Sequence, residues 1–443
     1  MQKEKLAFFY MLSAWVLAVL LSCIVFGPLS GTLTSSYHAR MVELFRSQGF
    51  ATYDNLSYGG RLFSYYPLGY FLAGGITRVV PPNIFYILFP AVNFSAFLFL
   101  IYKIHRKFSN TYSAMIVTLL IATFAYSSFG RFFIDQLSFV LAVLAVYLAL
   151  NKRFYLAGII SALTFLAHAE SFLFIVLFFI AYSFKDRKVL ISLLMGIFLA
   201  LPYYIYFLQK FNWYIPFLNP EYRWIVRSYW TDVTPGVVNL LKLRYFLFIG
   251  FAGAISYMRV KFYPALIIVG SIFVFSGSRF IDPLGIIFFS IPTAAFISGI
   301  KKRKVLYYAV LLYTLLYLGY AVSTPLQVKT GNDLMHTLNW IKENTSDNTT
   351  VIASIGDGHL ITYYAKRKDF ADGLFEYANL TKAKLDLLAF RGNKSYMKKI
   401  INTSYRPRVF LVKKQSRIYQ FLRDRFNILY KNGGYVVFGD KYD

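Results

Sequence analysis

The feature that most constrains this chain is a series of long apolar runs separated by short polar connections. A helix needs about 20 residues to cross the hydrocarbon core of a bilayer. Only 15% of the residues are charged and 57% are hydrophobic, whereas soluble proteins have roughly 25% charged residues. The sequence therefore predicts a polytopic α-helical membrane protein with about 11 transmembrane helices. The predicted spans are 6–27, 83–102, 112–129, 132–150, 154–168, 170–184, 189–208, 242–257, 261–276, 281–299 and 305–323.

The distribution of positive charge predicts which ends of these spans face the cytoplasm. A net charge of +27 would suit a nucleic-acid-binding protein, but the basic residues lie in short tracts between apolar runs, as the positive-inside rule describes. We therefore expect no nucleic-acid partner, a cytoplasmic N-terminus, and a multi-pass protein of the cell membrane in a prokaryote or of the endoplasmic reticulum in a eukaryote. The main tracts are 103–107, 152–153, 185–188 and 301–304.

The composition becomes polar after residue 323, and no later run is long enough to span a bilayer. Alternating short strands and helices in this stretch are typical of a small α/β domain. With the N-terminus inside, this domain lies outside, as does a long connection over 28–82. The predicted organisation is a transmembrane domain over 1–323 and an extracytoplasmic domain over 324–443. Its expected strands are 350–354, 408–413 and 434–439, and its expected helices are 334–342 and 416–426.

Carboxylates are rare in the first 323 residues, and most of them fall at the predicted outer face. Ionisable groups at membrane depth are costly, so those that occur are candidates for function. Asp135, Glu170 and Asp282 each lie close to an outer helix end, with basic neighbours a few residues away. Acids, guanidinium groups and an imidazole at one depth predict a site for a phosphorylated, sugar-like or cationic ligand. The basic neighbours are Arg131, His168 and Arg279.

Several segments resemble motifs of the GT-C glycosyltransferases, which are integral membrane enzymes that take sugars from polyprenyl-phosphate or polyprenyl-diphosphate donors. The resemblance is greatest to the catalytic subunit of archaeal and bacterial oligosaccharyltransferases, and it is spread over most of the chain. The matching segments are Tyr37-His38-Ala39-Arg40 (the family's D-x-x-Y-H-x-R loop), Tyr53-Asp54 to Gly69 (its Y-D and Y-P-x-G segment), Phe129 to Asp135 (its second acidic motif), Ser278 to Pro283 and Ile355 to Gly358 (the region of its W-W-D-Y-G motif).

This resemblance implies a GT-C fold and transfer of a sugar from a polyprenyl-linked donor to a protein, glycan or lipid acceptor on the outer face, in one inverting displacement. It implies that Asp135 acts as general base or metal ligand, with Asp54 or Glu170 assisting, and that a divalent metal such as Mg or Mn takes part. Asp357 would contact the acceptor. The residues implied for the donor phosphate are Arg131, Arg279, Arg40 and His38.

Departures from the family pattern keep other interpretations open. The first-loop Asp of the family aligns with Thr34, and both Trp residues of W-W-D-Y-G are missing. A catalytically silent GT-C relative or a transporter of lipid-linked sugars is the alternative function. Each site residue also has a structural alternative. These alternatives are an Asp135–Arg131 pair, a turn role for Asp54 and for Asp357, an interfacial helix carrying His38 and Arg40, an Arg279–Asp282 pair, and a polar pair formed by His168 and Glu170.

Overall fold

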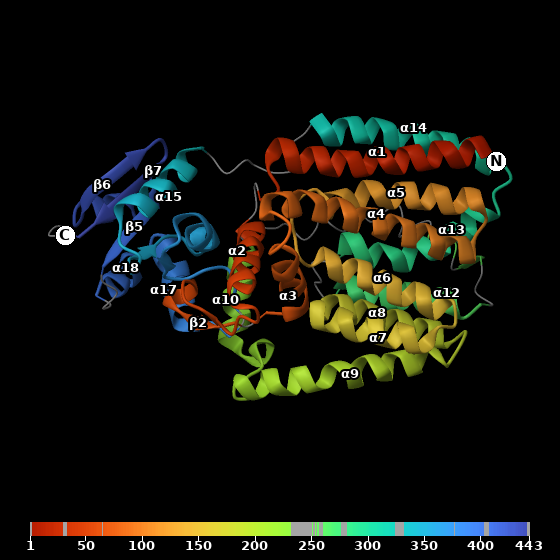
Figure 1. Ribbon diagram of the computed structural model, residues 1–443, viewed down its shortest axis with the longest axis horizontal. Helices are drawn as coiled ribbons and strands as arrows, with labels where there is room; N and C mark the ends of the chain where they lie inside the picture. The colour runs from red at the N-terminus through yellow and green to blue at the C-terminus, as the bar shows by residue number, and fades with distance from the viewer. Residues whose placement is uncertain are drawn as a thin grey trace.

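The chain forms a long helical bundle with an α/β unit at one end (Figure 1). Helices α2 (Leu33–Gln48), α3 (Pro67–Ile76) and α10 (Pro220–Thr231) lie between the bundle and this C-terminal unit. The computed structural model describes residues 2–29, 33–63, 65–231, 250, 253, 255–256, 260–275, 281–323, 332–375, 377–402 and 407–440.

Ten helices of the bundle coincide with predicted spans, and the predicted span 242–257 falls largely outside the described residues. Five of these helices, α1, α4, α5, α9 and α14, are long and apolar enough to cross a membrane. The other five are shorter apolar helices, so the number of spans stays a prediction. The ten are α1 (Gln2–Phe26), α4 (Pro82–Phe108), α5 (Thr111–Phe129), α6 (Gln136–Leu150), α7 (Phe154–Ala167), α8 (Ala169–Ser183), α9 (Val189–Lys210), α12 (Phe262–Phe275), α13 (Ile286–Ser298, preceded by η3, Ile281–Gly285) and α14 (Arg303–Ser323).

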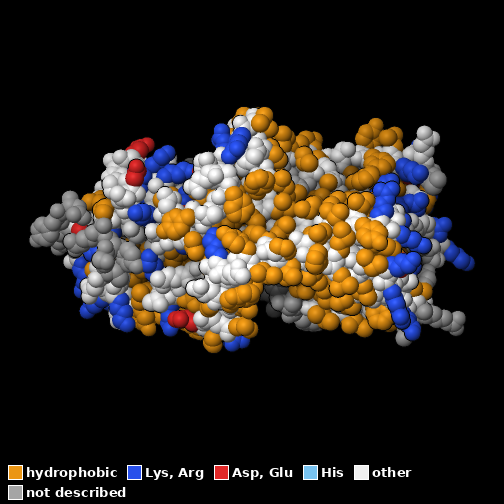
Figure 2. All heavy atoms as spheres, turned by 60° about the horizontal axis from the view of Figure 1, so that its bottom comes forward, with side chains coloured by type: hydrophobic (Ala, Val, Ile, Leu, Met, Phe, Trp, Pro, Cys, Tyr) orange, Lys and Arg blue, Asp and Glu red, His pale blue; other side chains and the backbone are white. Residues whose placement is uncertain are grey.

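The basic tracts lie together at the end of the bundle that is remote from the C-terminal unit, here called the distal end. Lys304 Nζ lies 3.2 Å from Glu4 Oε1, and Lys185 Nζ lies 5.2 Å from the ring centroid of Phe108. Figure 2 shows apolar side chains spread over the bundle surface, with Lys and Arg at its distal end. An apolar belt bounded by basic residues is typical of a membrane protein whose basic end faces the cytoplasm. The sidedness itself stays a prediction.

Small residues let α7 and α9 approach closely, as is common between membrane helices. A Cβ on Gly196 would lie 2.8 Å from Ser161 Cβ, and one on Gly158 would lie 2.9 Å from Met195 Cβ. We expect Gly196→Leu to destabilise the bundle by about 1–3 kcal/mol through overpacking. Gly319→Leu is the matched control, because nothing lies within 4 Å of a Cβ at that helical position. Equal unfolding midpoints of the two variants in detergent would contradict this packing argument.

The connection 28–82 folds into a layer over the proximal end of the bundle, the end that faces the C-terminal unit. Helix α2 carries His38 and Arg40, as the alternative of a helix in this connection expected, whereas α3 was not predicted because its ten residues are too few for a span. A hairpin of β1 (Tyr53–Asp54) and β2 (Arg61–Leu62) encloses η1 (Ser57–Gly59). A Cβ on Gly74 would lie 2.9 Å from the Phe45 carbonyl carbon, so glycine permits the close contact between α2 and α3.

The C-terminal unit is a five-stranded mixed sheet in the order β4-β3-β5-β7-β6. Strands β4, β3 and β5 are parallel, and β7 runs antiparallel to both β5 and β6. The predicted strands and helices are present, but the helix expected over 416–426 is shorter, and β4, β6, α17 and α18 were not predicted. The bounds are β3 (Thr350–Ile352), β4 (Lys368–Asp369), β5 (Arg408–Lys413), β6 (Asn427–Asn432), β7 (Tyr435–Gly439), α15 (Asn332–Asn344), η4 (Ile355–Asp357), α16 (Gly358–Leu360), η5 (Ile361–Ala365), α17 (Leu380–Phe390), α18 (Lys394–Ile401) and α19 (Tyr419–Arg423).

Two apolar clusters cover opposite faces of this sheet. One joins α15 and η5 to inward residues of β3 and β5, such as Val351 and Val409. The other joins α17, α18 and α19 to Ile352 and Phe410, which alternate with the first set along the same strands. Alternation of this kind places successive side chains on opposite faces of a strand. The second cluster also includes Tyr58 from η1 and Ile225 from α10. It therefore attaches the segments that lie between the bundle and the C-terminal unit to the sheet.

Candidate active site

The connection between α5 and α6 is held firmly at the proximal end of the bundle. The Phe132 N–H donates to the Pro28 carbonyl at 2.9 Å, and the Gln136 side-chain amide donates to the Arg131 carbonyl at 2.8 Å. Asp135 ends this connection directly before α6, and it is 1% exposed. The sequence therefore places a carboxylate in a fixed, buried position at a helix entry.

Asp135 faces two donors from different parts of the chain. The Tyr65 hydroxyl donates to Asp135 Oδ2 at 3.1 Å, and His168 Nε2 lies 3.7 Å from the same oxygen. His168 caps α8, and its Nδ1 accepts a hydrogen bond from the Glu170 backbone N–H at 3.2 Å. A neutral imidazole that accepts at Nδ1 carries its proton on Nε2. His168 therefore points an N–H towards Asp135, across a distance that is longer than a hydrogen bond.

Aromatic rings surround this pair. The His168 ring centroid lies 4.8 Å from that of Tyr66 and 6.0 Å from that of Tyr65. His38, from α2, lies on the other side of Tyr65, with its ring centroid 4.8 Å from that of Phe133. Its Nδ1 is 2.5 Å from the Tyr70 hydroxyl. The predicted site residues His38 and Asp135 are thus joined through Tyr65.

Arg40 and Asp54 form a buried ion pair with each other. The same Asp54 oxygen accepts the backbone N–H groups of Leu56 and Ser57, at 3.0 and 3.4 Å. These bonds fix the turn of the β1–β2 hairpin. A turn role was the structural alternative that the sequence offered for Asp54. The carboxylate of Asp54 is therefore committed to Arg40 and to the hairpin backbone.

A second buried acid cluster, which the sequence analysis did not predict as a site, ties the hairpin to the C-terminal unit. Asp372 accepts a hydrogen bond from Ser57 Oγ at 2.5 Å. It also lies 3.6 Å from Arg61 Nη2 and 3.6 Å from His359 Nδ1. Asp369, three residues earlier, accepts the Tyr58 N–H at 2.5 Å. Asp369 ends the short strand β4 and Asp372 follows three residues later, and this pair of acids was the only signal in the sequence.

The two acids of this cluster have opposite pKa shifts. Burial opposes the charge of Asp372, but Arg61 and His359 outweigh burial and hold the pKa of Asp372 below its usual value. Burial raises the pKa of Asp369 well above its usual value, and the charge of Asp372 raises it further. Asp372 is therefore the more acidic of the two and the charge partner of Arg61, whereas Asp369 keeps its proton to a higher pH than an ordinary carboxyl group does.

Arg131 is a half-buried cation close to Asp135 along the chain. Burial lowers the pKa of Arg131 to about 10, and no ion pair of Arg131, with Asp135 or with any other acid, occurs among the residues that the structure describes. The alternative of an Arg131–Asp135 pair is therefore wrong. A guanidinium group without a carboxylate partner is suited to bind a phosphate.

Comparison with solved structures identifies the architecture. ArnT from Cupriavidus metallidurans bound to undecaprenyl phosphate matches with a TM-score of 0.65 at 11% identity, covering 99% of this chain and 98% of that chain. An Archaeoglobus fulgidus oligosaccharyltransferase tethered to an acceptor peptide matches with a TM-score of 0.61 at 14% identity, covering 91% and 69%. The mycobacterial arabinofuranosyltransferase AftD matches with a TM-score of 0.51 at 12% identity, covering 98% and 40%.

This chain has the GT-C fold. The resemblance found in the sequence motifs is thereby confirmed at the level of the fold. No family model matches the sequence, and no curated protein matches it. The comparisons therefore identify the fold alone, and the activity is inferred below from the residues of the site.

Two of the other predicted site residues, Glu170 and Asp357, lie in different parts of the fold. Glu170 is half-buried in the first turn of α8, next to His168. Asp357 lies in the C-terminal unit after β3 and lines a crevice there. Arg279 falls outside the described residues, and the Asp282 side chain does too. The structure thus brings Asp135, His168 and His38 together around Tyr65, and Arg40 and Asp54 together in the hairpin.

The predicted divalent metal was tested against the donor groups that are present. One neighbour, the Archaeoglobus fulgidus oligosaccharyltransferase, has a structure in complex with zinc and sulfate. Within the described part of this chain, no three His, Cys, Asp or Glu side chains converge as a metal site would require. The donor set at Asp135, one carboxylate and one imidazole, does not fit a protein-bound metal, and the divalent metal stays a prediction.

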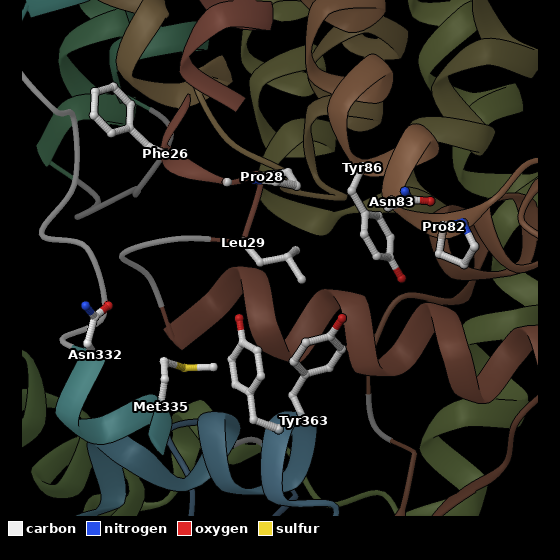
Figure 3. A pocket seen from close by; sticks show the side chains of 11 residues that line it. Phe26, Pro28, Leu29, Pro82, Asn83, Tyr86, Asn332, Met335 and Tyr363 are labelled. Atoms are coloured by element: carbon white, nitrogen blue, oxygen red, sulfur yellow. The ribbon is translucent and has the colours of Figure 1, made fainter. Parts of the chain in front are cut away.

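A cavity of about 590 Å³ opens between the proximal end of the bundle and the C-terminal unit. Figure 3 shows Tyr86 from α4 and Tyr363 from η5 facing it from opposite sides, with Phe26 and Met335 farther along. Its lining is mostly apolar and contains no acid or base, and none of the predicted site residues belongs to it. The predicted site residues therefore lie outside the lining of this cavity.

Proposed function

We propose that this protein transfers a sugar from a polyprenyl-phosphate-linked donor to an acceptor at the proximal end of the bundle, which is the outer face in the predicted topology. The observation that carries the proposal is the buried Asp135 carboxylate, positioned by Tyr65 and His168 at a helix entry of a GT-C fold. A buried, oriented carboxylate can deprotonate a nucleophile, and a guanidinium group in the same connection can hold a leaving phosphate.

The proposed reaction is a single inverting displacement. The acceptor oxygen or nitrogen attacks the anomeric carbon of the sugar, and the bond from that carbon to the phosphate oxygen breaks. Asp135 takes the proton of the acceptor, and the electron pair of the broken bond leaves on the phosphate. His168 keeps the carboxylate oriented during proton transfer, and Tyr65 donates to the same oxygen. Glu170, on the first turn after His168, assists from the neighbouring helix.

The leaving phosphate needs positive charge near it. Arg131 is proposed for this role because it lies in the same connection as Asp135, and Arg279, Arg40 and His38 are proposed as further contacts. Of these, Arg40 already pairs with Asp54, so its contribution depends on that acid. Two GT-C neighbours support a polyprenyl donor, since their structures contain dolichol-phosphate and undecaprenyl phosphate. Asp357 remains the proposed acceptor contact.

The test is transfer of a radiolabelled sugar from polyprenyl-monophosphate and polyprenyl-diphosphate donors by the purified protein in lipid nanodiscs. We expect Arg131→Gln to raise the KM for the donor by roughly tenfold or more, because a charge-assisted contact to the phosphate is lost. Arg153→Gln is the matched control, since Arg153 is exposed at the distal end. If no product forms with either donor, the silent-relative or transporter alternative replaces this proposal.

A further inference from the structure

The sheet of the C-terminal unit contains a topological switch point between β3 and β5. These two strands are adjacent and parallel, so their carboxyl ends lie at the same edge. The chain leaves β3 towards η5, which packs with α15 on one face of the sheet. It leaves β5 towards α19, which packs in the cluster on the opposite face. In open α/β sheets, ligands bind in the crevice that forms where connections diverge in this way.

A cavity of about 700 Å³ occupies this crevice, which is within the size range of small-molecule sites. Its walls come from the segments that follow the two strands and from the end of α17. The lining residues are Ser354, Gly356, Asp357, Phe390, Arg391, Leu411, Lys413, Gln415, Ser416 and Arg417. We call this cavity the basic crevice.

Three of these lining residues are cations, and Asp357 is the one acid among them. The turn after α17 brings two of the cations together, because Arg417 Nη1 donates to the Arg391 carbonyl at 3.4 Å. Gly392 makes this approach possible: it has a φ of +101°, and a Cβ there would lie 2.9 Å from Arg417 Cβ. Arg391 is anchored from the other side, with Nη2 donating to the Ser228 carbonyl of α10 at 2.7 Å.

A crevice lined mainly by cations concentrates counter-ions, so it favours an anionic ligand. Asp357 adds a carboxyl group to the cations that line the crevice. Its carboxyl accepts no side-chain hydrogen bond from any described residue, so it is available to hydroxyl donors. Cations together with one open acceptor fit a ligand that carries both a phosphate and hydroxyl groups.

We propose that the basic crevice binds a phosphorylated sugar. Lys413, Arg417 and Arg391 contact the phosphate, and Asp357 accepts hydrogen bonds from the sugar hydroxyls. Asp357 is the one residue that this site shares with the proposed acceptor contact, and the binding of a phosphorylated sugar does not depend on the transfer reaction.

The test measures binding of glucose 6-phosphate, inorganic phosphate and glucose to the full chain in detergent by calorimetry at low ionic strength, where charge contacts are least screened. We expect glucose 6-phosphate to bind and glucose not to. The double variant Lys413→Gln/Arg417→Gln should bind glucose 6-phosphate on the order of tenfold more weakly. Lys431→Gln/Arg423→Gln is the matched control, because both residues are exposed in the same unit and neither lines the crevice.

A second variant tests the contact to the sugar hydroxyls separately from the contacts to the phosphate. Asp357→Ala should weaken glucose 6-phosphate several-fold and leave inorganic phosphate unaffected, since inorganic phosphate has no sugar hydroxyls. Displacement of glucose 6-phosphate by phosphatidylinositol vesicles would assign the site to a lipid-borne sugar phosphate, and no displacement to a soluble one. Equal binding of glucose, or equal binding by the double variant and its control at unchanged unfolding midpoints, would overturn the proposal.

Discussion

Replacing Asp135 by asparagine is expected to reduce sugar transfer by about 10²–10⁴-fold, the range for loss of a general base. Asparagine has nearly the same shape and still accepts the Tyr65 hydrogen bond, but it cannot take a proton from the acceptor. His168 would continue to present its Nε2–H to the side-chain oxygen, because its Nδ1 is fixed by the Glu170 N–H. The loss should therefore appear in kcat, with the KM for the donor little changed.

Single-turnover transfer from a labelled polyprenyl-linked donor measures this effect without interference from product release. Asp186→Asn is a suitable control, because Asp186 lies at the distal end and its contact with the Lys188 N–H survives the change. Transfer by Asp135→Asn at the wild-type rate would place the base elsewhere. Glu170→Gln would be the next variant, since Asp54 is held by Arg40.

The helices of the bundle could be predicted because each carries its own signal. A run of apolar residues and the basic tracts that bound it are local features, and the burial of the helix follows from them. The candidate acid at a helix entry was also predictable, since Asp135 interrupts two apolar runs. Helix α3 was missed because a ten-residue apolar stretch carries too little signal for a span. Strand β4 has only two residues and has no periodicity to detect.

The contacts that make the site could not be predicted in the same way. Tyr65 and Asp135 are 70 residues apart, and Ser57 and Asp372 are 315 residues apart. Nothing in either local sequence indicates the partner, because the pairing is decided by how α2, α3 and the hairpin pack over the bundle. The basic crevice is a similar case. Lys413 and Arg391 look like ordinary surface cations in the sequence, and only the order of the strands brings both into the lining of one crevice.

Replacing Asp372 by asparagine is expected to destabilise the protein by about 3–5 kcal/mol, the usual result of removing one partner from a buried ion pair. Arg61 would be left buried without its carboxylate, and the contact to His359 would lose its charge. Because the pKa of Asp372 is lowered in the folded protein, its stabilising contribution is fully present above the unfolded value of about 3.9. That contribution is lost as the pH falls through the lower folded value.

Asp369→Asn should have the opposite effect, although the two acids are three residues apart in one cluster. The pKa of Asp369 is raised in the folded protein, so its stabilising effect is present below the unfolded value and is lost as the pH rises through the folded one. Asparagine stays neutral at every pH and still accepts the Tyr58 N–H. We expect the variant to gain about 1 kcal/mol at neutral pH.

Unfolding midpoints in detergent, measured from about pH 4 to pH 8, compare the two variants with the wild type. The Asp372→Asn variant should lose nearly the same amount at every pH in this range, because the contribution of the wild-type pair is already fully present above about 3.9. The Asp369→Asn variant should differ least from the wild type in acid, where Asp369 already holds its proton, and exceed it at neutral pH. Equal losses from both variants would mean that the two carboxylates share the charge of Arg61. In that case the cluster would be one delocalised pair rather than an ionised acid beside a protonated one.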